Sequence, residues 1–283
     1  MILLDLNQTI IASLMAHIGS NPKTEIQENM VRHIVLNSIR SFSRQFKSKY
    51  GELVICCDNK SYWRRDVFPF YKAHRKKDRE KSDFDWNLIF NTINKIKEEL
   101  KEFSPYRVIE VEYAEADDII AVLTKKFAGQ QSILILSSDK DFVQLQKFDD
   151  VRQYSPSLKR FINTDNPYSF IKEHIIRGDR GDGIPNFLSA DNVFALGERQ
   201  KSINSKKLVE WLDQKPEDFC TNDQMLRGFK RNEMLVDFDF IPDEIKANII
   251  KVYEDAVPQK RQVFLNYMMK KNMRNLIQDI GDF

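Results

Sequence analysis

Short runs of hydrophobic residues alternate with longer amphipathic stretches through the first half of the chain. Residues 2–4, 53–57 and 133–136 are continuous apolar runs, and residues 106–112 alternate between apolar and polar positions. A short apolar run that ends at polar residues is typical of a strand buried in a parallel sheet. We therefore predict strands at these places and a further, edge strand at residues 151–154.

Between these runs, apolar positions recur three or four residues apart, which is the spacing of an amphipathic helix. The helices predicted in this way span residues 8–17, 27–46, 86–103 and 115–127. From residue 167 to residue 276 the pattern is again helical, apart from a turn-rich segment at 177–185.

Alternating strands and helices predict a doubly wound α/β domain with a central, mostly parallel sheet. We place this domain at residues 1–183 and a smaller helical C-terminal lobe at residues 184–283. The chain has 283 residues, of which 42% are hydrophobic and 30% charged, as expected for a soluble globular protein of this size.

The composition also limits where the protein is expected to act. Apolar runs fall well short of the roughly 18 residues of a membrane span, and the first residues lack the basic region of a signal peptide. The cysteines Cys56, Cys57 and Cys220 do not have the spacing of zinc ligands. We expect a protein of the cytoplasm, with no membrane association.

Acidic residues follow three of the predicted strands. Asp5, Asp58 and Asp139 each stand at the end of an apolar run, and the carboxyl ends of neighbouring parallel strands lie about 4.8 Å apart along one edge of a sheet. Further acids occur at Glu115, Asp117, Asp118, Asp141 and Asp182. Together they predict an acidic pocket, because carboxylates this close are costly to ionise unless cations lie between them.

The acidic set has no interleaved histidine or thiol in the sequence, so its ligands would all be oxygens. Such ligands favour Mg²⁺, or Mn²⁺, over Zn²⁺, and two ions about 3.5–4 Å apart suit phosphodiester hydrolysis. Any one of these acids could equally be a helix cap or a solvated side chain. For Asp118 a role at the helix start is as good an explanation as a metal ligand, and Asp179 is open in the same way.

A basic and aromatic segment, which we call the basic bridge, covers residues 61–83. Its cations could bind phosphates and its rings could stack on bases, which makes Arg64, Arg65, Tyr71, Lys76 and Lys77 candidate nucleic-acid contacts. Lys72 and Arg75 would share one helix face and could stabilise charge on a scissile phosphate. The alternative is a solvated basic helix whose aromatic residues belong to the core.

These residues together resemble the flap endonuclease, or 5′-nuclease, family. The resemblance is carried by Asp5, Asp58, the run from Tyr71 to Arg75, the acidic run from Glu115 to Asp118, the run from Ser138 to Asp141, and the run from Gly178 to Pro185. Residues 36–40, 62–66 and 235–243 extend it and make the chain similar to the ribonuclease H branch found in T-even bacteriophages.

The resemblance implies a PIN-like α/β nuclease core, a helical arch formed by the basic bridge, and a helix-three-turn-helix. It implies one metal at Asp5, Asp58, Glu115, Asp117 and Asp139, and a second at Asp141 and Asp182 with neighbours such as Asp118. Lys72 and Arg75 would contact the scissile phosphate. The implied activity is Mg²⁺-dependent 5′→3′ exonuclease on RNA–DNA and DNA duplexes and cleavage of 5′ flaps and forked DNA, to remove primers from lagging-strand fragments in an infected bacterium.

The segment after Pro185 departs from the family pattern, since it retains only Gly197 where two close glycines are usual. This puts a monovalent-ion site and close duplex contact in doubt. Arg199, Lys201, Lys206 and Lys207 could still bind duplex phosphates, or could be solvated surface residues.

The last apolar segment, residues 276–283, could dock a sliding clamp or a single-strand-binding protein, although packing against the lobe is the simpler role for it. We expect a monomer. Two other functions remain open: a flap-binding scaffold without catalysis, and an aspartyl phosphatase, although Asp5-Leu6-Asn7 lacks the second acid that the phosphatase would need.

Overall fold

The structure is a computed structural model that describes residues 1–19 and 26–283. Its centre is a six-stranded sheet with the order β3-β2-β1-β4-β5-β6. The strands are β1 (Ile2–Asp5), β2 (Leu53–Cys57), β3 (Arg107–Glu110), β4 (Ile133–Leu136), β5 (Val151–Ser155) and β6 (Arg160–Ile162). All neighbouring pairs are parallel except β5 and β6, so the predicted mostly parallel sheet is confirmed.

One strand prediction was wrong in its position. We expected residues 151–154 to form an edge strand, but β5 pairs with β4 on one side and with β6 on the other. The outermost strand is β6, a three-residue segment whose exposed Arg160 and Phe161 gave no strand pattern in the sequence.

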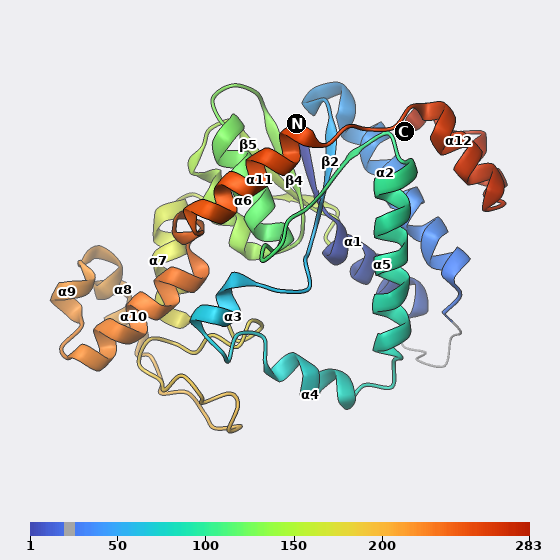
Figure 1. Cartoon of the computed structure of the whole chain (residues 1–283). Coiled ribbons are helices and arrows are strands. Elements are labelled where there is room, and N and C mark those ends of the chain that lie inside the picture. The colour runs from blue at the N-terminus through green and yellow to red at the C-terminus, as the bar shows by residue number, and fades with distance from the viewer. Residues whose placement is uncertain (20–25) are drawn as a thin grey trace.

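Helices cover both faces of the sheet (Figure 1). One face carries α1 (Leu6–Ile18), α2 (Glu28–Tyr50) and α5 (Trp86–Phe103), which pack on alternate strand residues such as Ile2 and Leu4. The other face carries α6 (Ala116–Phe127), the 3-10 helix η1 (Lys140–Lys147) and α11 (Asp243–Asp255), packed on residues such as Leu3. Every residue of β1, β2 and β4 is buried, which explains their continuous apolar sequence.

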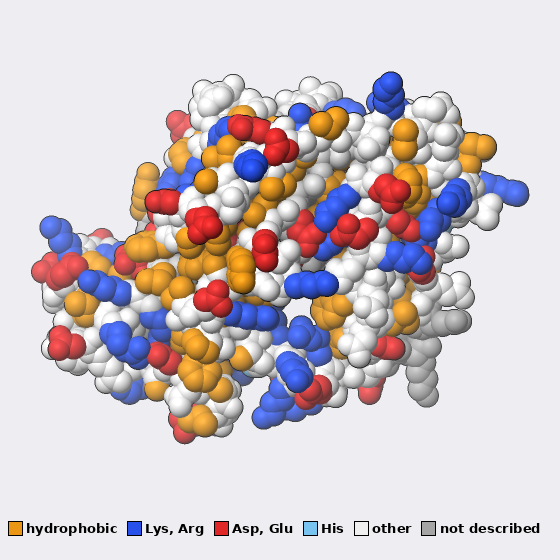
Figure 2. Space-filling model, viewed as in Figure 1, with side chains coloured by type: hydrophobic (Ala, Val, Ile, Leu, Met, Phe, Trp, Pro, Cys, Tyr) orange, Lys and Arg blue, Asp and Glu red, His pale blue; other side chains and the backbone are white. Residues whose placement is uncertain are grey.

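The basic bridge runs along the lower side of the molecule in Figure 1, between β2 and α5. It contains two short helices, α3 (Trp63–Val67) and α4 (His74–Glu80), joined by turns. Figure 2 shows Lys and Arg side chains gathered around α4, with acidic side chains above them on the side of the sheet.

The helices after β6 begin with α7 (Pro167–Arg177), followed by a turn-rich connection and then α8 (Ser205–Asp213), α9 (Pro216–Phe219) and α10 (Asp223–Val236). They share a third apolar cluster with Phe68 and Tyr71 of the basic bridge. The connection, residues 178–204, lies where the resemblance implied a helix-three-turn-helix, and it consists of turns without a helix of its own.

The end of the chain returns to the α/β core. The 3-10 helix η2 (Phe238–Phe240) and α11 join the cluster around α6, while α12 (Arg261–Lys270), α13 (Arg274–Ile277) and η3 (Ile280–Asp282) lie near α2 and α5. In the segment 276–283, Leu276 and Phe283 are buried in the core cluster of α1 and α2. This segment packs, as the simpler interpretation held, but on the N-terminal core and not within a separate lobe. No helix in the described ranges is long and apolar enough to cross a membrane.

Candidate active site

A row of three carboxylates stands at the carboxyl edge of the sheet. Asp5 ends β1, Asp58 follows β2 and Asp139 follows β4, and these three strands are direct neighbours. Asp117, in the first turn of α6, joins them around a cavity of about 330 Å³. The structure thus brings together the strand-end acids that the sequence singled out.

Backbone and amide groups hold these carboxylates in place. Asp5 accepts a hydrogen bond from the Gln8 amide at 3.0 Å and thereby caps α1. Asp58 accepts one from the Ala116 amide at 2.8 Å and another from the Asn7 side chain at 2.8 Å. The helix-cap and metal-ligand interpretations are therefore compatible, because each of these carboxylates has a second oxygen or lone pairs to offer.

Burial and mutual repulsion make these carboxylates weak acids. Burial, with the charge of Asp58 second, raises the pKa of Asp5 to about 7. Burial and the neighbouring Asp141 raise the pKa of Asp139 to about 6. The pKa of Asp117 is raised well above its ordinary value by burial and by Asp139 and Asp5. A bound cation would remove this repulsion, so the electrostatics of the cluster favour one.

Glu115 behaves differently because it faces cations. Its carboxylate accepts hydrogen bonds from Lys72 Nζ at 2.5 Å, from Tyr71 Oη at 2.9 Å and from Arg64 at 3.0 Å. Burial alone would raise the pKa of Glu115, but the charges of Lys72 and Arg64 outweigh it and lower the pKa to about 2. Glu115 is therefore ionised and already paired.

Lys72 and Arg75 extend from the basic bridge into the acidic pocket. Lys72 Nζ lies 3.6 Å from Asp182, and Arg75 binds the same carboxylate at 2.6 Å. Lys72 has a positive φ of 55°, and its amide donates to the Asp182 carbonyl at 2.7 Å. This turn places both cations beside the carboxylates. The prediction that Lys72 and Arg75 share one helix face was wrong, because α4 begins only at His74 and Lys72 lies in the turn before it.

Three predicted site residues need correction. Arg64 is buried and forms ion pairs with Glu115 and with Asp118 at 2.8 Å, so it cannot contact a nucleic acid. Asp118 is fully buried, accepts from the Glu115 amide at 3.0 Å and pairs with Arg64, which favours its role at the helix start over that of a metal ligand. Tyr71 is 2% exposed and donates to Glu115 and Asp182, so its ring does not stack on a base here.

A second acidic group lies beyond Asp139. Asp141, His174 and Asp179 present potential ligand atoms within 4.8 Å of one another, with His174 Nε2 lying 3.0 Å from Asp141. The sequence argument missed His174, because it looked only at acids after strands. The sequence did contain a feature that could have identified His174: it lies on a predicted helix, four residues before Gly178 in the turn-rich segment. Lys140, which lies 3.0 Å from Asp179, balances part of the charge.

The remaining predicted contacts are spread over the surface. Arg65, Lys76 and Lys77 are exposed on the basic bridge. Arg199, Lys201, Lys206 and Lys207 are exposed on the turn-rich connection and the start of α8. Their exposure is compatible both with phosphate binding and with a solvated surface, so the assignment stays a prediction.

The donor set fits divalent metal ions. Asp5, Asp58, Asp117 and Asp139 line one cavity and supply only oxygen, the donor that hard cations such as Mg²⁺ and Mn²⁺ prefer. Asp141 and Asp182 lie close enough to Asp139 for their charges to contribute to its raised pKa. The second group also offers the His174 nitrogen, which was not part of the predicted set.

A mostly parallel α/β sheet with carboxylates along one edge, and with cations of the basic bridge beside them, is typical of nucleases that bind divalent metal ions through acidic residues. Residues 1–174 match the family described as 5′-3′ exonuclease, N-terminal resolvase-like domain. Residues 168–283 match the family described as T4 RNase H, C terminal. The chain belongs to the 5′-3′ exonuclease family and is a hydrolytic 5′-nuclease.

Two curated relatives agree with this assignment. The chain is 35% identical to the ribonuclease H of Enterobacteria phage T4, over 99% of this chain and 95% of the relative. It is 32% identical to a 5′-3′ exonuclease of Mycoplasmopsis pulmonis, over 52% of this chain and 48% of that protein.

Solved structures share the fold at low sequence identity. The T5 D15 protein co-crystallised with metal ions matches with a TM-score of 0.65 and 17% identity, covering 90% of this chain and 97% of the other. A T5 D15 flap endonuclease variant, solved as a pseudo-enzyme-product complex with DNA and metal ions, has a TM-score of 0.59 at 17% identity, covering 90% and 99% of the two chains.

Proposed function

We propose that this protein is a Mg²⁺-dependent 5′→3′ exonuclease and 5′-flap endonuclease that acts by two-metal phosphodiester hydrolysis. Its substrates would be RNA–DNA and DNA duplexes with 5′ ends, flaps or forks, and its task would be primer removal during phage DNA replication. The observation that carries the proposal is the row of Asp5, Asp58 and Asp139 on three adjacent strand ends, with Lys72 and Arg75 facing it.

The acidic and basic side chains would have different roles in this reaction. Asp5, Asp58, Asp117 and Asp139 would hold one cation, and Asp141 and Asp182 the second, with Mn²⁺ able to replace Mg²⁺. Ions held at these places would supply Lewis-acid chemistry that lowers the pKa of water and stabilises negative charge on oxygen. Glu115 is held by Lys72 and Arg64, so we assign it to orienting Lys72 more than to direct metal binding.

Lys72 and Arg75 would bind the scissile phosphate. Without substrate their charges are paired with Glu115 and Asp182. A phosphodiester that enters the cavity carries one negative charge, and a second develops in the transition state, so hydrogen bonds from both cations would stabilise the transition state more than the bound substrate. Arg65, Lys76 and Lys77 on the same bridge are placed to bind the flanking backbone.

The setting of this activity is also part of the proposal. The phage relative suggests action in the cytoplasm of an infected bacterium. We propose that the protein works as a monomer and that replication proteins, such as a single-strand-binding protein or a sliding clamp, bring it to its substrate. Because Leu276 and Phe283 are buried, those two side chains do not form the docking surface.

An end-labelled 5′-flap duplex tests the proposal. We expect cleavage with Mg²⁺ and none in EDTA. Asp139→Asn should slow cleavage by at least about a hundredfold, since one carboxylate ligand is worth several kcal/mol of metal-assisted catalysis, and should leave flap binding intact. Asp149→Asn, at an exposed acid away from the cavity, is the matched control and should cleave normally. Unchanged cleavage by Asp139→Asn, or cleavage in EDTA, would refute the two-metal assignment.

A further inference from the structure

A glutamine lies in the interior of the sheet, on a face where apolar residues are expected. Gln153 of β5 is fully buried, and Val151, two residues before it and on the same face of the strand, belongs to the apolar cluster that contains residues of α6 and η1. Burying an amide costs free energy unless its hydrogens and its oxygen have partners. The partners of Gln153 therefore show what this polar residue does in the core.

The Gln153 amide fastens the chain just beyond the end of β4. Its Nε2 donates to the Ser137 carbonyl at 3.0 Å and to the Asp139 carbonyl at 2.6 Å. Its Oε1 accepts a hydrogen bond from the Gln146 side chain at 3.5 Å. The ladder between β4 and β5 ends at Leu136, so the glutamine side chain ties the next residues to β5 where the backbone of the sheet no longer does.

The segment held in this way carries one end of the carboxylate row. The Asp139 carboxylate caps η1 by accepting from the Asp141 amide at 3.0 Å. Ser137, also fully buried, donates from Oγ to Asp5 at 3.1 Å, and the same oxygen accepts from the Asp139 amide at 3.2 Å. A single hydroxyl thus connects the acids that follow the neighbouring strands β1 and β4.

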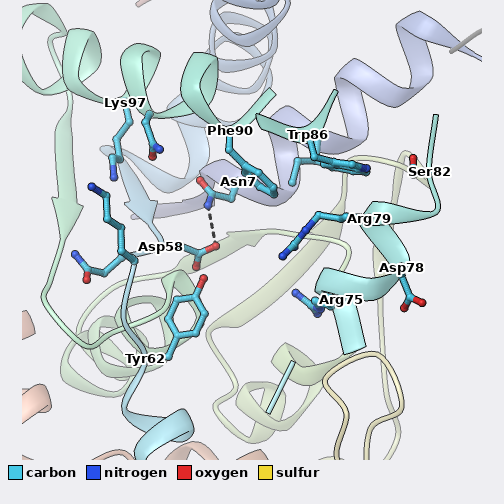
Figure 3. Close-up of a pocket in the computed structure, with 14 residues that line it drawn as sticks. Asn7, Asp58, Tyr62, Arg75, Asp78, Arg79, Ser82, Trp86, Phe90 and Lys97 are labelled. Atoms are coloured by element: carbon cyan, nitrogen blue, oxygen red, sulfur yellow. Dashed lines mark hydrogen bonds between the residues drawn. The ribbon is translucent and has the colours of Figure 1, made fainter. Parts of the chain in front are cut away.

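Asp58 and Asp139 are supported in different ways. Figure 3 shows the Asn7 side chain directed at Asp58, and its amide donates straight to that carboxylate at 2.8 Å. For Asp139 the support reaches the backbone, since Gln153 holds its carbonyl and Ser137 holds its amide. The position of the Asp139 carboxylate therefore depends on two buried side chains that do not line the cavity themselves.

We propose that Gln153 is a positioning residue of the active site. Through the Ser137 and Asp139 carbonyls it holds the segment after β4, while the Ser137 hydroxyl fixes that segment to Asp5, so that the two carboxylates keep the spacing that a shared divalent cation needs. The negative charges of Asp5 and Asp139 repel each other, and without the amide the segment would relax away from β1. The inference rests on the proposed function, because it takes both aspartates to be ligands of one cation.

Mn²⁺ binding without substrate tests this inference. Mn²⁺ is titrated into each protein, and the free ion is followed by electron paramagnetic resonance. Gln153→Met keeps the approximate length of the side chain but removes both donors. We expect it to bind Mn²⁺ roughly tenfold more weakly than the wild type, because residues that support metal ligands usually contribute at least that much to metal affinity.

Gln144→Met is the matched control. Gln144 is 5% exposed and also makes two hydrogen bonds with backbone groups, to the Val236 carbonyl and from the Phe238 amide, in the connection between α10 and η2. Urea unfolding should show a similar loss of stability in both variants, whereas only Gln153→Met should lose Mn²⁺ affinity. Equal Mn²⁺ affinities of the two folded variants would overturn the proposal, since the buried amide of Gln153 would then only stabilise the fold.

A smaller change covers the case in which Gln153→Met does not fold. Ser137→Ala removes one oxygen and with it the connection between the Asp139 amide and Asp5, so Mn²⁺ affinity should again fall roughly tenfold. Wild-type affinity in Ser137→Ala would overturn the proposal as well. A wild-type protein that binds no Mn²⁺ would contradict both this inference and the metal-dependent function. One that binds Mn²⁺, with weaker binding in the variants, but cleaves no flap would contradict only the proposed flap cleavage.

Discussion

Single buried carboxylates link the site to the stability of the protein. The pKa of Asp5 is raised to about 7, chiefly by burial, whereas an unfolded chain has an ordinary aspartate pKa of about 3.9. Between these two pH values the folded protein holds a proton that the unfolded chain releases. Stability is therefore lost as pH rises through this window, in the absence of metal.

This gives a pH prediction for Asp5→Asn. Below about pH 4 the variant and the wild type should respond to pH alike, because Asp5 is neutral in both states of the wild type. From about pH 4 to 7 the wild type should lose up to about 4 kcal/mol of unfolding free energy relative to the variant, and the difference should then level off.

Urea unfolding in EDTA at several pH values measures this difference. Adding Mg²⁺ should stabilise the wild type at pH 8 more than at pH 5, because the cation binds the ionised carboxylates. If the unfolding free energies of Asp5→Asn and the wild type differed by the same amount at every pH in this range, the pKa of Asp5 would not be raised in the folded protein.

Two adjacent arginines have opposite roles. Arg64 is buried in ion pairs with Glu115 and Asp118, while Arg65 is exposed with its guanidinium 4.7 Å from the Tyr62 ring centroid. Arg64→Ala should lower the unfolding free energy by roughly 3–5 kcal/mol, because it leaves the buried Asp118 without a cation and removes one of the two cations that pair with Glu115. Arg65→Ala should change it by at most about 1 kcal/mol.

Urea unfolding of the two alanine variants at pH 7 makes this comparison, with Arg65→Ala as the matched control. If Arg65 binds phosphate, the order of the two variants should be reversed in a binding experiment. At low salt, Arg65→Ala should then lose more affinity for the substrate than Arg64→Ala. Equal stability of the two variants would show that the ion pairs of Arg64 contribute little.

At the level of elements, the sequence predicted what depends on local periodicity. Helix 86–103 has the predicted bounds, since its apolar stripe is continuous and Asp85 caps it. The helix predicted at 27–46 continues to Tyr50. The prediction ended too early because three of the four residues in the last turn are polar and so do not extend the apolar pattern. The sequence also predicted correctly that the aspartates after β1, β2 and β4 lie near one another. These strands are parallel neighbours, so their carboxyl ends all lie at the same edge of the sheet.

The basic bridge could not be predicted in this way, because its side chains are placed by partners far away in the sequence. Arg64 and Tyr71 have the composition of a nucleic-acid contact, yet they lie inward because Glu115, 51 and 44 residues away, receives their hydrogen bonds. His174 joins Asp141 only through the packing of α7 on η1. Composition describes a segment, while the direction of each side chain depends on the tertiary fold.

On the scale of the whole molecule, the end of the chain closes the N-terminal core. Phe283 is 1% exposed and its ring packs edge-on against Phe264 at 5.2 Å, within the cluster that also contains Ile10 and Ile39. The Phe283 carbonyl accepts hydrogen bonds from Arg261. The division at residue 183 stays a prediction, and residues on both sides of it contribute to one apolar cluster.

This shared core predicts that damage at the end of the chain destabilises the start. Phe283→Ala should lower the unfolding free energy by roughly 3–5 kcal/mol, the usual cost of removing a buried phenylalanine. Hydrogen exchange should then speed up in α1 and α2, which contact the same cluster, and not only in α12. Phe240→Ala, at a 43% exposed ring, is the control and should cost much less. Faster exchange confined to α12 and α13 would mean that this segment is an appendage that opens without the core, and would restore it as a candidate docking segment.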